Sequence, residues 1–170
     1  MSFPASSKTN VRLSLLLIMS LSVSLLALAQ VTLKYRMLNG YSLSSDAPVN
    51  KDKPTLFVFE QAETFGQVFN PAAVNRRSDQ PDFNKEMLIG VTVPPTTTPP
   101  KLSISKVFVQ DSMLTVRYVR LTDTTEAKTP QSFTSQPTLL LAIPRQTVLK
   151  TRLVENGKVV QTIRKRESEE

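Results

Sequence analysis

Residues 55–59 read Thr-Leu-Phe-Val-Phe, an uninterrupted run of β-branched, aliphatic and aromatic residues. Such a run is typical of a strand that is buried on both faces, so we predict an inner strand at residues 55–59, at the centre of the core. Residues 87–93 (MLIGVTV) predict a second buried strand, and residues 138–143 (TLLLAI), between two prolines, a third. These three segments indicate a β-rich domain.

Apolar residues repeat at helical spacing directly after the first of these strands. Ala62, Phe65, Val68 and Phe69 fall on one helical face, which predicts a short amphipathic helix packed on the sheet. Pro71 ends this helix, because a proline disfavours helical backbone at the residue before it.

The N-terminal part of the domain has the pattern of a hairpin. Residues 31–37 alternate apolar and polar side chains, as a strand with one buried face does. Asn39 and Gly40 tolerate the positive φ angles of a tight turn, so we expect residues 41–45 to return beside this strand. Residues 46–54 are polar and predict a surface loop.

The C-terminal half predicts further strands. Residues 113–122 change character midway along both faces, which indicates a bulge or a strand covered at one end. Asn156-Gly157 lies between two alternating segments and is the strongest hairpin signal in the chain. The strands expected here lie at residues 102–109, 113–122, 148–154 and 158–164.

The predicted fold class is α+β and predominantly β. We expect about six or seven mostly antiparallel strands in one sheet, sandwich or roll, with one short amphipathic helix packed on it. A chain of 170 residues favours one domain, because a second core would leave too little chain for each.

Residues 1–29 have the order of a secretory signal peptide. Lys8 and Arg12 precede an apolar run at residues 13–28, and the segment ends in small residues at Ala29. We expect cleavage after Ala29 and a mature chain in the periplasm or outside the cell. The alternative is an N-terminal membrane anchor, although the run contains serines and is shorter than the roughly 20 residues that cross a bilayer comfortably.

The composition excludes several classes of enzyme. The chain has no cysteine or histidine, so it can form neither a Ser-His-Asp triad nor a thiol nucleophile, and it lacks the nitrogen and sulfur ligands of zinc. None of its four glycines lies in a phosphate-binding loop. We therefore expect no cofactor and no metal.

Three other patterns suggest chemistry only weakly. Residues 103–106 match the S-x-x-K spacing of penicillin-binding enzymes, but they lie in a predicted strand, which sends residues three apart to opposite faces. Asp79, Asp82 and Glu86 are the carboxylates on which a hydrolase would have to rely, although aspartates in such a loop usually form turns. Residues 123–126 (DTTE) lack the ligand count of a calcium loop.

Two surfaces are candidates for binding a partner. The first is the stiff loop at residues 93–100 (VPPTTTPP), which we expect to project from the domain. The second is the basic C-terminal hairpin. We do not expect nucleic acid to bind there, because exposed aromatic residues that could stack on bases are scarce. We expect an acidic protein to bind this hairpin, and a membrane surface to attract it weakly. The candidate partner-binding residues are Pro94, Pro95, Thr97, Pro99, Pro100, Arg152, Lys158 and Arg164.

The central part of the chain resembles the family of PrcB C-terminal domains. The resemblance is carried by TLFVF at residues 55–59, DFNKEMLIGVTV at 82–93, ISKVFVQDSMLTVRYV at 104–119 and QPTLLLAIPR at 136–145. It implies that Phe83 fills the core beside Met87 and Ile89, and that Gly90 keeps its strand thin. It also implies an exported, non-enzymatic domain that supports the stability of a protease complex. The chain departs from the family in its loop at residues 93–100, where a glycine is typical, and in lacking a lipid-anchored cysteine.

The expected organisation and function follow from these patterns. We expect a signal peptide at residues 1–29, an N-terminal strand, hairpin and loop at 30–54, the PrcB-like domain at 55–145, a hairpin at 146–164 and a charged tail at 165–170. The expected function is non-catalytic: the domain binds or stabilises another envelope or secreted protein, such as a protease complex. The alternatives are a carboxylate-based hydrolase of an envelope polymer and a carrier of a small ligand or lipid.

Overall fold

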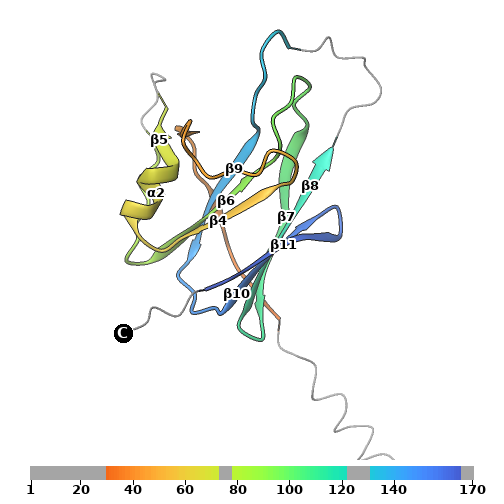
Figure 1. The fold of residues 1–170 in the computed structure, drawn as a ribbon. Helices are drawn as coiled ribbons and strands as arrows, with labels where there is room; N and C mark the ends of the chain where they lie inside the picture. Colours follow the sequence, from red (N-terminus) through yellow and green to blue (C-terminus); the bar gives the residue numbers. More distant parts are fainter. Residues whose placement is uncertain (1–29, 73–77, 122–130, 166–170) are drawn as a thin grey trace, which may run out of the picture.

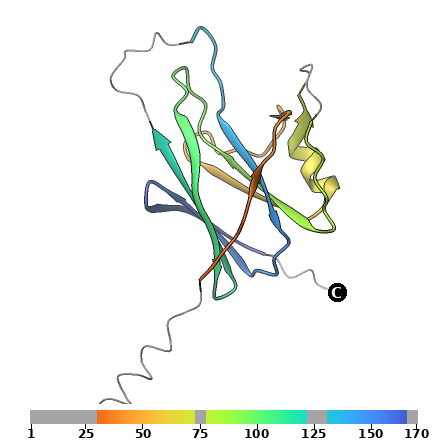
Figure 2. The same ribbon diagram turned by 180° about the vertical axis from the view of Figure 1, so that it is seen from behind.

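The structure is a computed structural model that describes residues 30–72, 78–121 and 131–165 (Figures 1 and 2). One helix and eleven strands follow one another along these segments. Their bounds are β1 Val31–Thr32, β2 Arg36–Met37, β3 Tyr41–Leu43, β4 Thr55–Phe59, α2 Ala62–Val68, β5 Phe69–Pro71, β6 Glu86–Thr92, β7 Lys101–Gln110, β8 Met113–Leu121, β9 Thr138–Pro144, β10 Lys150–Glu155 and β11 Lys158–Arg164.

Two sheets form a sandwich. The five-stranded sheet has the order β1-β7-β8-β10-β11, and the four-stranded sheet has the order β2-β9-β6-β4. All neighbours are antiparallel except β8 and β10, which are parallel. One cluster of buried side chains includes Ile89 and Leu141 from the four-stranded sheet and Val116 and Leu153 from the other, so the main core lies between the sheets. The predicted fold class is therefore confirmed.

The four-stranded sheet is covered on both faces. Met87 and Ile89 point into the core between the sheets, whereas Leu88 belongs to a second cluster formed with Phe65 of α2 and Phe69 of β5. Alternate residues of β6 thus enter different cores, which explains why residues 87–91 include no polar side chain. Helix α2 and the small sheet β3-β5 form the outer layer on this side (Figure 1).

Two expectations drawn from the resemblance have different outcomes. A Cβ atom on Gly90 would lie 3.1 Å from the Phe69 ring, so glycine does allow a close approach at this point of β6. The expected place of Phe83 is wrong. Its ring lies 6.0 Å from that of Phe65, and it packs against the cluster under α2, on the opposite side of β6 from Met87 and Ile89.

Strand β4 is buried, but it is not an inner strand. It pairs with β6 alone and forms one edge of the four-stranded sheet. Strand β4 is buried by the layers above and below it. A run of apolar residues indicates burial, but it does not show whether a strand lies at the edge or in the middle of its sheet. The side chain of Gln161 covers part of this edge, since its Oε1 accepts a hydrogen bond from the amide of Leu56 at 2.7 Å.

The N-terminal segment crosses from one sheet to the other. Strand β1 pairs with β7 in the five-stranded sheet, and β2 pairs with β9 in the four-stranded sheet. The alternating face predicted for residues 31–37 is largely exposed, at 57% for Val31 and 38% for Met37. The expected hairpin is also wrong: Gly40 has a positive φ of 80°, but β3 turns away and pairs with β5.

The C-terminal hairpin forms as expected and completes the five-stranded sheet. Asn156 and Gly157 have φ values of 47° and 84°, the positive values of the predicted turn. The side chain of Asn156 then exchanges two hydrogen bonds with the main chain of Arg120, at 3.0 and 3.1 Å. These bonds dock the turn on β8 beyond the end of the parallel ladder.

The bulge lies in the neighbouring strand. The register between β7 and β8 shifts between Ile104 and Lys106, so the extra residue, Ser105, belongs to β7. Strand β8 alternates regularly and places Val116 and Tyr118 in the core.

Within the described segments no helix is long and apolar enough to cross a membrane. The predicted signal peptide at residues 1–29 lies outside those segments.

Candidate functional site

The outer face of the five-stranded sheet is basic. The strands of this sheet contain eight cations and one carboxylate, Glu155. Glu155 points to the inner side, where the Tyr118 hydroxyl donates a hydrogen bond to it and Arg120 lies 3.9 Å away. Six of the cations share the outer face by register, and Lys101 lies apart from the others at the far end of β7. The remaining five lie level with residues 113–117 of β8, and together we call them the basic face: Lys106, Arg117, Lys150, Arg152 and Arg164.

An aromatic ring holds two cations of the basic face. Phe108 lies on the outer side of β7, yet it is only 6% exposed. The ammonium of Lys106 lies 5.3 Å from the centre of its ring and the guanidinium of Arg117 lies 5.4 Å from it. Both are within cation–π range, so the ring restrains the positions of the two charges.

Arg152 lies beside this pair. It is next to Thr115 in the parallel ladder, and it lines a hollow of ≈ 370 Å³ together with Phe108 and Arg117. Its Nε atom is buried and has no hydrogen-bond partner within the described segments. Part of its guanidinium is therefore packed against the sheet at the wall of the hollow.

The structure separates the predicted partner-binding residues: Arg152 and Arg164 belong to the basic face, whereas Lys158, next to the Asn156-Gly157 turn, and the Pro-Thr loop do not. The loop at residues 93–100 lies at the end of the sandwich where Lys101 pairs with Leu121, whereas Arg152 is level with Thr115. Six residues of strand, or about 20 Å, lie between these levels. The Pro-Thr loop and Arg152 therefore do not form one site.

The Pro-Thr loop is also less free than expected. Thr96 and Ser135 exchange main-chain hydrogen bonds of 2.8 and 2.9 Å, and the amide of Gln131 donates to Thr97. Pro95 and Thr97 are exposed, whereas the other three predicted residues of this loop, Pro94, Pro99 and Pro100, are partly buried. The loop is thus braced along one side.

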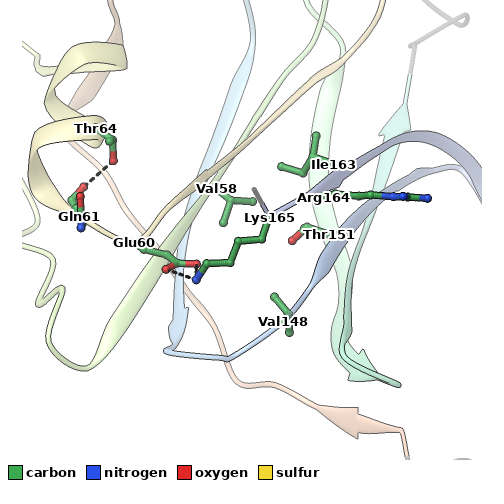
Figure 3. Close-up of a pocket in the computed structure, with 9 residues that line it drawn as sticks. All are labelled: Val58, Glu60, Gln61, Thr64, Val148, Thr151, Ile163, Arg164 and Lys165. Carbon is green, nitrogen blue, oxygen red and sulfur yellow. Dashed lines mark hydrogen bonds and ion pairs between the residues drawn. The ribbon is translucent and has the colours of Figure 1, made fainter. Parts of the chain in front are cut away.

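A groove lies where the edges of the two sheets approach each other (Figure 3). We call the space between β4 and β11 the β4–β11 seam, and the opening beside Val58 and Ile163 has a volume of ≈ 340 Å³. Val58, Val148 and Ile163 give this opening an apolar wall. Glu60 and Lys165 form an ion pair of 2.7 Å across it. Arg164 also lines the groove, but its side chain points away from it (Figure 3).

The carboxylates proposed for a hydrolase are engaged separately. Glu86 accepts two hydrogen bonds from the guanidinium of Arg36, at 2.7 and 3.0 Å, and these bonds lower the pKa of Glu86. A general acid needs a raised pKa, so Glu86 is poorly suited to that role. Asp79 accepts a bond from the amide of Asn39, and Asp82 organises its own turn by accepting from the amide of Asn84.

Among the residues that the structure describes, the most perturbed titratable group is Tyr118. Burial raises its pKa, and the adjacent Glu155 carboxylate raises it further. The hydroxyl stays protonated and donates to Glu155, in a cluster that Arg120 completes. Tyr118 is 1% exposed, whereas the side chains of Arg120 and Glu155 are 30% and 20% exposed, so the cluster is a polar network at the edge of the core.

Ser103 and Lys106 of the S-x-x-K segment are kept apart for a different reason from the one predicted. The extra residue Ser105 restores Ser103 and Lys106 to the same face of β7, so strand alternation does not separate them. Lys106 instead extends over the ring of Phe108, which lies further along the strand.

No group of three metal-binding side chains occurs among the described residues. The predicted calcium segment, residues 123–126, lies outside them.

Two features of these surfaces were not predicted from sequence. Strict alternation along residues 102–109 would place Phe108 on the same side as Leu102 and Ile104, but the bulge at Ser105 turns it outward beside Lys106 and Arg117. The β4–β11 seam joins residues about a hundred positions apart, so no local pattern could have indicated it.

No family model matches this chain, and no curated protein or solved structure matches it either.

Proposed function

We propose that this protein is a non-catalytic binding domain that docks on an acidic surface of another protein and stabilises it. The basic face carries the proposal. It places five cations on one side of a sheet whose single strand carboxylate points to the other side. Such a one-sided charge distribution attracts an acidic partner and orients it.

The rigidity of this face supports a protein as the partner. Arg117 lies over the Phe108 ring, and Arg152 packs partly against the sheet at the hollow beside it. Side chains that are already ordered lose less entropy on binding, and fixed guanidinium groups suit the planar geometry of carboxylates. A fluid lipid surface makes no use of such fixed positions, so attraction to anionic membranes is the weaker candidate.

Neither of the other two functions has comparable support. For a hydrolase, Glu86 is held by Arg36 and its pKa is lowered. For a lipid carrier, the space between the sheets would have to be empty, but it is filled by fully buried side chains such as Ile89, Val116 and Leu153. Binding without catalysis is thus the function that the geometry supports best.

The proposal includes export and the kind of partner that the resemblance to PrcB C-terminal domains implies. We propose that the chain is processed after Ala29 and acts in the periplasm or outside the cell. A protease complex is one partner of this kind. N-terminal sequencing of the protein from its native compartment tests the processing, and a chain that begins before Gln30 would contradict it.

A charge-matched pair of variants tests the basic face. Arg117→Gln/Arg152→Gln removes two of its cations, and Lys51→Gln/Lys53→Gln removes two exposed lysines from a loop elsewhere. Two exposed ionic contacts of about 0.7 kcal/mol each correspond to a roughly tenfold loss of affinity. We expect this loss for the arginine variant alone, measured on a partner identified by cross-linking and mass spectrometry. The interaction should also weaken as salt increases.

Three results would contradict the proposal. Equal losses in both variants would mean that only net charge matters. Tight binding of both to phosphatidylglycerol vesicles, without any cross-linked protein, would favour a membrane surface. Substrate turnover that disappears in Glu86→Gln would instead favour the hydrolase.

A further inference from the structure

We propose that the β4–β11 seam binds an extended peptide of a partner protein, which pairs with β11 as an additional strand and carries an acidic side chain. This site is separate from the basic face and does not depend on it. Strand addition at an exposed sheet edge obtains its affinity from main-chain hydrogen bonds and its specificity from alternate side chains.

The seam exposes main-chain groups of β11. The amide of Lys165 donates to Leu149 at the start of β10, so the main chain of Lys165 faces β10. Because successive residues of a strand face opposite ways, the amides and carbonyls of Thr162 and Arg164 face the seam. No main-chain hydrogen bond from either residue crosses the seam within the described segments.

The edge of β4, on the other side of the seam, also exposes main-chain groups. The amide of Leu56 points away from β6, since it donates to the side chain of Gln161. The same alternation turns the main chain of Val58 toward the seam. The amide oxygen of Gln161 here takes the place of a strand carbonyl, which shows that the edge of β4 can accept a main-chain-like partner at this position.

The open end of the seam has the size and lining of a ligand site. Its volume of ≈ 340 Å³ falls in the range of about 300–1,000 Å³ that is usual for such sites. Val58, Val148 and Ile163 can receive apolar side chains, while Thr151 lies 4% exposed at its base. An extended segment fits this lining when its alternate side chains are apolar.

Charge favours an acidic peptide. Glu60 and Lys165 are the charged side chains that face the groove, since Arg164 points away from it (Figure 3). Glu60 is engaged by Lys165, whose side chain is 51% exposed and thus within reach of a second carboxylate. An acidic side chain of the peptide therefore has a cation available beside the groove.

The bulge of β11 lies at the end away from the groove, whereas Lys165 borders the groove itself. The register between β10 and β11 shifts between Leu153 and Val154, near the turn, and Lys158 is there as well. A bulge and a lysine discourage pairing at an edge. From Gln161 to Arg164 the register is regular, and this is the part that borders the open groove.

Peptide selection tests the proposal. A phage-displayed library of random ten-residue peptides is selected on the purified protein, and the best binder is synthesised. We expect alternating apolar residues and at least one acidic residue in the selected sequences. Thr162→Pro removes one seam-facing N–H, which an edge strand tolerates, and should weaken binding roughly tenfold. Arg117→Gln/Arg152→Gln should leave the affinity within twofold, which separates this site from the basic face.

A change to the peptide avoids any effect on folding. Methylation of alternate backbone nitrogens removes hydrogen-bond donors and keeps every side chain. Two such peptides exist, one methylated at the odd positions and one at the even positions. We expect at least a tenfold loss of affinity for the peptide whose methylated nitrogens face β11. The proposal is wrong if no peptide is enriched, if both methylated forms bind as tightly as the parent, or if the arginine variant abolishes binding.

Discussion

Gly66 and Gly90 show how differently the same residue can be constrained. Gly66 lies in helix α2 at an exposed position, and a Cβ atom there would meet nothing within 4 Å. Gly90 lies in the buried strand β6, where a Cβ atom would come within 3.1 and 3.2 Å of the Phe69 ring. Neither residue has a positive φ, so the difference is one of space rather than of backbone conformation.

Replacing each of these glycines with alanine should change stability in opposite directions. Gly66→Ala should raise the free energy of unfolding by about 0.5–1 kcal/mol, because glycine loses more backbone freedom in a helix than alanine does. Gly90→Ala should lower it by about 1–3 kcal/mol, because the Phe69 ring must shift. Urea unfolding followed by circular dichroism measures both. A neutral or stabilising Gly90→Ala would contradict the close packing against Phe69.

At the scale of elements, the C-terminal hairpin depends on its turn for more than its own formation. Asn156 adopts a positive φ, and its side chain binds the main chain of Arg120 twice. Its main-chain amide also donates to the carbonyl of Tyr118 at 3.1 Å. One turn residue therefore joins the hairpin to β8, the only parallel neighbour in the five-stranded sheet.

Asn156→Ala should lower the free energy of unfolding by about 1–3 kcal/mol. The variant loses two side-chain hydrogen bonds and places alanine at a positive φ, which is unfavourable for that residue. Asn156→Gly is the matched control, because it also loses the side-chain bonds but tolerates the backbone conformation. The difference between the two variants measures the backbone cost, and equal stabilities of both variants and the parent would show that the docking bonds contribute nothing.

At the scale of the whole molecule, the two sheets depend on both ends of the described chain. The N-terminal segment supplies an edge strand to each sheet, and the C-terminal hairpin supplies two strands to the five-stranded sheet. Leu153 is fully buried and Val148 is 5% exposed, so both belong to the main core. The core therefore extends beyond residues 55–145, the part with the resemblance.

A fragment of residues 55–145 should not fold as an independent unit. It lacks β10 and β11, and without them Leu114 and Val116, which are fully buried, lose their neighbours in the core. We expect no cooperative unfolding transition for this fragment in thermal or urea denaturation, whereas residues 30–165 should unfold cooperatively. A cooperative transition of the shorter fragment would show that the hairpin is an addition to a domain that is complete without it.

The sequence by itself determined the elements that depend on local pattern. The buried strands, the helix with Phe65 and Val68, and the Asn156-Gly157 hairpin follow from hydrophobic periodicity and turn chemistry, which act over a few neighbouring residues. Most of the core could be predicted in this way. The cations Arg152 and Arg164 were also identified from sequence, although not the surfaces to which they belong.

Only the tertiary structure decided how these elements are arranged. Burial of β4 at an edge, the crossing of residues 31–37 between sheets and the pairing of β3 with β5 depend on contacts between distant segments. A single inserted residue, Ser105, turned Phe108 outward beneath two cations. Hydrophobic periodicity records whether a side chain is covered, but not which part of the chain covers it, and both proposed binding surfaces depend on that choice.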